Sequence, residues 1–163
     1  MHRIITLTAT LGLSGIGAAA ASTLPGPVEA IITGYVNQCH QLGGNLVDGA
    51  GRPQIMTGDF DGDGTPDYVL NPQNLRCSAA ATAFCGNGGC QITIALSGHH
   101  YQAPITVLGG QPTIVQKPSG LTVEIWVRGS NCSGFDREKA CWASYSWIEE
   151  RATTSYQLRP RPQ

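Results

Sequence analysis

Charge is scarce in this chain, and neither sign prevails. Charged residues make up 13% of its 163 residues, and the formal net charge is −1 at pH 7. A nucleic-acid-binding surface needs clustered positive charge, and a mimic of nucleic acid needs clustered negative charge. The composition therefore argues against nucleic acid as a partner.

Motifs that mark common catalysts are absent as well. The sequence holds no serine-centred nucleophile elbow, no H-E-x-x-H pair and no Walker loop. No two cysteines stand in C-x-x-C spacing, the close pairing typical of zinc sites. Acid pairs for glycoside hydrolysis have no sequence signature, so Glu124, Asp136 and Glu138 stay open as carboxylates that could meet in space.

A long uncharged and largely apolar run occurs only at the start of the chain. A basic start at residues 1–3 precedes such a run at residues 4–17, and small residues follow at 18–22. This order predicts a secretory signal peptide over residues 1–21. The run contains Thr, Ser and Gly and falls short of the roughly 20 apolar residues of a membrane span. We therefore expect a secreted or periplasmic protein that does not associate with a membrane after cleavage.

Glycine and proline are plentiful, with 21 and 10 residues, which favours short strands between turns. One segment is different, because apolar side chains recur there at helical spacing after Pro27. The residues of this stripe are Val28, Ile31, Ile32, Tyr35, Val36 and Cys39. They predict an amphipathic helix with one buried face that ends at Gly43–Gly44.

The rest of the chain reads as strands, at about residues 68–70, 91–96, 105–108, 113–115, 121–127, 142–148 and 153–158. The segment 121–127 alternates most regularly between apolar and other side chains. Gly109–Gly110 is expected to form a turn between two of the strands. These elements predict one α+β domain at residues 22–158, with the N-terminal helix packed on an antiparallel sheet, and a disordered tail at 159–163.

Six cysteines lie beyond the predicted signal peptide. An even number in an exported chain predicts three disulfides formed in an oxidising compartment. Fifteen pairings are possible, and closure of short loops favours Cys132 with Cys141 and Cys85 with Cys90, which leaves Cys39 with Cys77.

The segment that carries chemistry is GDFDGDGTPDYVL, residues 58–70. Asp59, Asp61, Asp63 and Asp67 occupy positions 1, 3, 5 and 9 of a loop that turns sharply at its sixth residue, a glycine. Calcium takes six to eight oxygen ligands, and the carbonyl of Thr65 at position 7 can add one. Four converging carboxylates without a basic neighbour in sequence would repel one another unless a cation neutralised them. The loop therefore predicts a Ca²⁺ site.

This loop differs from an EF-hand, whose twelfth position holds a bidentate Glu where this chain has Leu70. It resembles the D-x-D-x-D-G-x-x-D calcium loop of FG-GAP (VCBS-type, integrin-like) repeats, which lies between strands. The resemblance covers about thirteen residues in a single copy, so it implies no propeller. It implies side-chain ligation by the four aspartates and carbonyl ligation by Thr65.

Two other groups of residues are candidates for function. The adjacent His99 and His100 are expected at an exposed hairpin tip, because no acid lies near them in sequence to orient either ring. Aromatic residues gather near the C-terminus at Trp126, Trp142, Tyr145 and Trp147. We expect them to fill the core, with a sugar- or protein-binding patch as the alternative.

The function expected from these features is that of a calcium-binding, non-catalytic binding or structural module whose partner is a protein or a glycan. Two alternatives stay open. One is a small secreted hydrolase with a structural calcium site, and the other is an inhibitor of a secreted enzyme.

Overall fold

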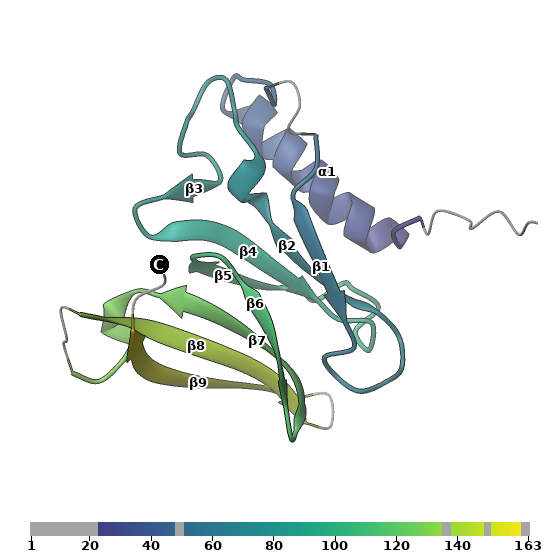
Figure 1. The fold of residues 1–163 in the computed structure, drawn as a ribbon. Coiled ribbons are helices and arrows are strands. Elements are labelled where there is room, and N and C mark those ends of the chain that lie inside the picture. Colours follow the sequence, from purple (N-terminus) through teal and green to yellow (C-terminus); the bar gives the residue numbers. More distant parts are fainter. Residues whose placement is uncertain (1–22, 48–50, 135–137, 149–150, 161–163) are drawn as a thin grey trace, which may run out of the picture.

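The computed structural model describes residues 23–47, 51–134, 138–148 and 151–160, so the predicted signal peptide lies outside the described residues. This part of the chain contains one α-helix and nine strands, whose arrangement can be followed in Figure 1. Their bounds are α1 (Gly26–Gln41), β1 (Gln54–Gly58), β2 (Asp67–Asn71), β3 (Cys85–Gly86), β4 (Gly89–Ala95), β5 (Ile105–Gly109), β6 (Thr113–Lys117), β7 (Gly120–Val127), β8 (Lys139–Ile148) and β9 (Arg151–Pro160). Two short 3₁₀ turns, η1 (Pro72–Asn74) and η2 (Gly129–Asn131), complete the list.

The predicted architecture of a helix on one antiparallel sheet is wrong. The strands form two antiparallel sheets, one of β1, β2, β4, β3 and β5, the other in the order β6-β7-β8-β9. The fold is therefore mostly β, with a single short helix (Figure 1). Strand periodicity shows which side chains share a face, but it does not show how many sheets the strands make. For this reason the second sheet could not be predicted from the sequence.

The main hydrophobic core joins the two sheets. Val69 and Ile92 of the first sheet belong to one buried cluster with Val123, Ile125 and Ala143 of the second. The helix packs against a different set of residues, since Val28 and Ile32 cluster with Tyr68 and Leu70. Neighbouring residues of β2 thus enter different clusters, which explains why its three central residues are all buried.

Gly109–Gly110, expected as a turn, is where the chain passes from one sheet to the other. β5 pairs with β4, whereas β6 pairs with β7. A Cβ on Gly109 would clash with Cγ2 of Ile125, and one on Gly110 would clash with Nε1 of Trp126. Glycine is therefore required here by close packing.

The three favoured disulfides, Cys39–Cys77, Cys85–Cys90 and Cys132–Cys141, are confirmed. They indicate an oxidising environment, extracellular or periplasmic. Among the described residues, no helix has the length and apolar character needed to cross a bilayer. Arg159 and Pro160, which fall within the predicted tail, are the last two residues of β9, and residues 161–163 lie outside the described residues.

Candidate metal centre

The Asp loop, residues 59–66 together with Asp67, connects two paired strands. Gly58 at the end of β1 is directly opposite Asp67 at the start of β2. Gly62 and Gly64 take left-handed backbone, with φ of 79° and 83°, which glycine adopts without the steric cost that a side chain brings. The loop therefore returns to its starting point and brings its first and last aspartates together.

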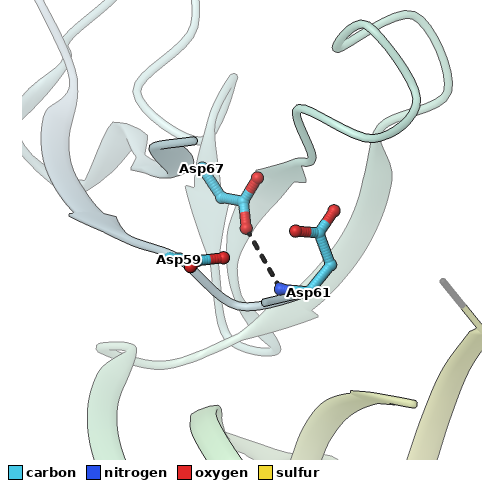
Figure 2. A group of neighbouring side chains, drawn as sticks. All are labelled: Asp59, Asp61 and Asp67. Carbon is cyan, nitrogen blue, oxygen red and sulfur yellow. Dashed lines mark hydrogen bonds between the residues drawn. The ribbon is translucent and has the colours of Figure 1, made fainter. Parts of the chain in front are cut away.

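Three carboxylates meet in this loop. One oxygen from each of Asp59, Asp61 and Asp67 lies within 4.8 Å of the other two (Figure 2). Hard oxygen donors at this spacing suit a calcium ion, whose ligands stand about 2.3 to 2.6 Å from the metal. These three residues could therefore hold a metal ion, and calcium as that ion stays a prediction.

Asp67 is fully buried and organises the loop by accepting hydrogen bonds. Its Oδ2 accepts from the backbone N–H of Phe60 at 2.6 Å and, at 3.4 Å, from that of Asp61. Its Oδ1 accepts from the backbone N–H of Ser97 at 2.7 Å and from Ser97 Oγ at 2.9 Å. A buried carboxylate requires such donors, because an unpaired charge in the interior is costly. Asp67 therefore has a structural role whether or not a metal binds.

Asp59 and Asp63 shape the exposed part of the loop. The two oxygens of Asp59 accept from the backbone N–H groups of Gly62 at 2.7 Å and Gly64 at 3.0 Å. Asp63 Oδ1 accepts from the backbone N–H of Thr65 at 2.6 Å. Asp63 is not in the group of three carboxylates, and its ligation and that of the Thr65 carbonyl stay predictions.

Ser97 and Gly98, in the turn after β4, take part in the site and were not found by sequence reasoning. Ser97 Oγ lies 2.9 Å from Asp63 Oδ2 as well as from Asp67 Oδ1, and the backbone N–H of Gly98 donates to Asp61 Oδ2 at 3.3 Å. A hydroxyl has one proton and can donate to only one of these oxygens at a time. The signal was missing because these residues are about thirty positions away in sequence.

The same turn also holds the two histidines of interest. His99 and His100 are exposed, as expected of a hairpin tip. The turn takes left-handed backbone at His100 and Tyr101, with φ of 51° and 60°. Tyr101 Oη donates to the carbonyl of Pro66 at 2.9 Å, so this turn contacts the Asp loop at a second point.

The negative charges of the Asp loop have no cationic side chain as a partner among the described residues. Partial burial, followed by the negative charge of Asp67, raises the pKa of Asp61. Hydrogen bonds from the Thr65 backbone and Ser97 lower the pKa of Asp63. Within the part of the chain that the structure describes, no lysine or arginine forms an ion pair with these aspartates. Among the described residues, the groups that stabilise these carboxylates are N–H and O–H donors.

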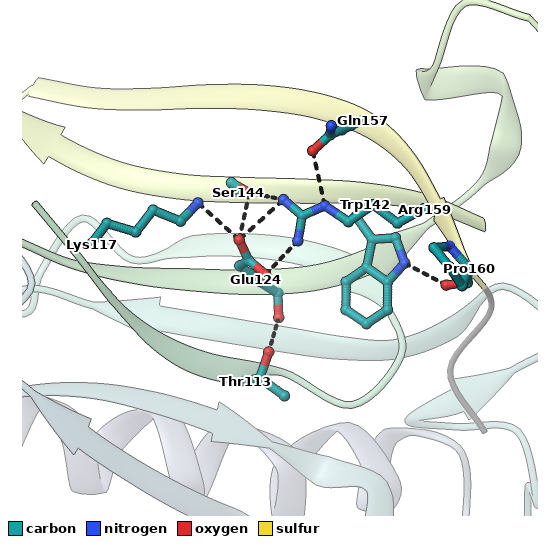
Figure 3. Close-up of polar contacts among 8 residues, drawn as sticks. All are labelled: Thr113, Lys117, Glu124, Trp142, Ser144, Gln157, Arg159 and Pro160. Carbon is teal, nitrogen blue, oxygen red and sulfur yellow. Dashed lines mark hydrogen bonds and ion pairs between the residues drawn. The ribbon is translucent and has the colours of Figure 1, made fainter. Parts of the chain in front are cut away.

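Glu124 on β7 differs from the aspartates of the loop, because cationic side chains contact its carboxylate. Its carboxylate is 2.6 Å from Arg159 Nη1 and 2.8 Å from Lys117 Nζ, and it accepts from Ser144 Oγ at 3.1 Å (Figure 3). The hydrogen bond from Arg159 is the main cause that lowers the pKa of Glu124 to about 2. A general acid in glycoside hydrolysis needs a raised pKa, so Glu124 does not suit that role. Asp136, its suggested companion, lies outside the described residues.

The aromatic residues divide between the core and the surface. Tyr145 and Trp147 are buried between the sheets, and the ring of Trp147 stacks on Phe60 at 5.9 Å between centroids. Trp126 and Trp142 are only partly buried. The expectation of a core role therefore holds for the first pair alone.

Comparison with known proteins adds no family to these observations, because no family model, curated protein or solved structure matches the chain.

Proposed function

We propose that the protein is a calcium-binding, non-catalytic module that acts outside the cytoplasm. The observation that supports this most directly is the meeting of three carboxylates within 4.8 Å at Asp59, Asp61 and Asp67. A cation at this point would remove the repulsion that Asp61 experiences from Asp67. Calcium suits the donor set because every side-chain ligand is a carboxylate oxygen.

The contribution of calcium is structural in this proposal. The Asp loop connects β1 to β2 and contacts the Ser97 turn that follows β4. An ion held by the loop would therefore stabilise the side of the first sheet at which β1 ends and β2 begins. Calcium with saturated oxygen coordination is a poor activator of water compared with zinc, so this site favours stabilisation over catalysis.

The test is a calcium titration of the mature chain followed by thermal unfolding. We expect calcium at about ten times its Kd to stabilise the native state by about 1.4 kcal/mol, because it binds the native state alone. A Kd of roughly 10⁻⁴ to 10⁻³ M would be typical of an extracellular module. Asp61→Asn should abolish the shift, whereas Glu29→Gln, which removes an exposed carboxylate on the helix, should keep it.

The opposite result is easy to recognise. If several millimolar calcium gives neither heat in a calorimeter nor a rise in melting temperature, the proposed calcium site is refuted. An equal rise in Asp61→Asn would show that the ion binds elsewhere.

A further inference from the structure

A cleft opens at the end of β4 opposite the Asp loop. Its volume is about 730 Å³, and it is lined by Arg76, the Cys85–Cys90 disulfide, Gly110, Gln111 and Trp126, among others. Gln73 at the 3₁₀ turn η1 completes this wall. The volume is comparable with that of small-ligand sites, roughly 300 to 1,000 Å³, but the cleft is a shallow hollow that is open to solvent.

The cleft lies between parts of the chain that are held firmly in place. The disulfide closes the β3–β4 hairpin, in which Cys85 is opposite Cys90. The indole of Trp126 rests on Gly110, whose backbone N–H also donates to the Trp126 carbonyl at 2.9 Å. A preformed wall loses little conformational entropy when a ligand binds.

The polar groups of the cleft are mainly donors. Arg76 has an exposed side chain and, among the described residues, no carboxylate partner. Gln73 already uses its side-chain oxygen to accept from Asn71, which leaves its amide N–H groups for a ligand. A second cation is near, since Arg128 Nε lies 3.9 Å from the Cβ position of Gly88 in the same hairpin. None of the described residues that line the cleft is acidic, so this part of the cleft favours an anion.

We propose that this cleft binds an acidic saccharide, a sugar ring that carries a carboxylate. The guanidinium of Arg76 would receive the carboxylate through paired N–H bonds, a geometry that arginine provides and lysine does not. The indole of Trp126 offers a flat apolar surface with a polar N–H at its edge, which suits a ring with an apolar face and hydroxyl groups. The amides of Gln73 and Gln111 can bond to those hydroxyls.

This inference is independent of calcium binding, because the two sites stand at opposite ends of β4. Gly89 and Cys90 at the start of the strand line the cleft, whereas Ser97, two residues past its end, contacts the Asp loop. Binding measured with calcium chelated by EDTA therefore tests the cleft alone.

The experiment is calorimetric titration of the mature chain in EDTA with an α-1,4-linked galacturonic acid trimer, using maltotriose as the neutral control. The acidic trimer should bind and maltotriose should not. Arg76→Gln should weaken binding at least about tenfold, and Arg76→Lys should restore only part of the loss. Trp126→Phe should weaken binding and remove any quenching of tryptophan fluorescence by the ligand.

Arg52→Gln is the matched control variant, since Arg52 is an exposed arginine that pairs with Glu29 on the helix. Equal weakening by Arg52→Gln and Arg76→Gln would show diffuse charge attraction and would overturn the proposal. So would equal binding of maltotriose, absence of binding at 10 mM trimer, or tighter binding of acetate or of trialanine than of the trimer.

Discussion

The two acidic centres of the protein, Glu124 and the Asp loop, differ in the charge of the groups that surround their carboxylates. Glu124 is a single carboxylate held by two cations, and its pKa is lowered to about 2. The Asp loop brings three carboxylates within 4.8 Å, and only N–H and O–H groups face them among the described residues. In the second sheet the chain supplies its own countercharge, whereas among the described residues no lysine or arginine forms an ion pair with the Asp loop. This difference separates a structural ion pair from a candidate cation site.

The largest expected effect is at the centre that is already balanced. Glu124→Gln leaves Arg159 and Lys117 facing a neutral amide at a buried position, and both cations stay about a third exposed, so we expect a loss of about 2 to 3 kcal/mol in the free energy of unfolding. Urea unfolding measures it. Glu29→Gln, which breaks an exposed pair with Arg52, should cost less than about 1 kcal/mol. Similar losses in the two variants would contradict the special role of Glu124.

The same residue predicts a pH dependence. The folded-state pKa of Glu124, about 2, is below its usual value of 4.5, so the unfolded chain binds its proton first as the pH falls. Its contribution is therefore present above pH 4.5 and is lost between about pH 4.5 and pH 2. Stability curves should fall more steeply over this interval in the wild type than in Glu124→Gln. Parallel curves would assign acid unfolding to other carboxylates.

A smaller loss is expected from the organiser of the Asp loop. Asp67→Asn keeps the size of the side chain but places an amide donor against N–H groups of Phe60 or Ser97. We expect a loss of about 2 kcal/mol even in EDTA, because a buried hydrogen-bonding site becomes mismatched. Asp63→Asn, at an exposed position, should cost much less in the same chemical denaturation. Equal stability of wild type and Asp67→Asn in EDTA would argue against a structural role for Asp67.

The smallest effect is the most diagnostic, because its sign should depend on calcium. Asp61→Asn removes a carboxylate, and the pKa of this group is raised by burial and by Asp67. In EDTA the free energy of unfolding of the variant should therefore equal that of the wild type or exceed it by a few tenths of a kcal/mol. With calcium present, the wild type should become the more stable of the two. Thermal unfolding in both buffers gives the comparison, and an unchanged order would contradict a cation at this site.

Patterns among residues close in sequence were sufficient to predict several features that the structure shows. The helix was predicted from an apolar stripe that includes Val28 and Cys39, both of which are buried. The pairing of Cys132 with Cys141 followed from closure of a short loop. The alternation of aspartates around Gly64 marked the Asp loop, where three of the four carboxylates do meet. Such features depend on residues close in sequence, so they can be predicted from the sequence.

Tertiary structure decided most of the contacts between residues that are distant in sequence. Alternation within residues 121–127 predicted a strand but did not show that it belongs to a second sheet packed on the first. Ser97 reaches Asp67 across thirty positions, and Arg159 reaches Glu124 across thirty-five. The neighbours of a side chain on the next strand depend on register and sheet order, which local periodicity leaves open. The sequence by itself therefore determined which residues could carry charge and form elements, and only the order and register of the strands within each sheet decided which of those charges have partners.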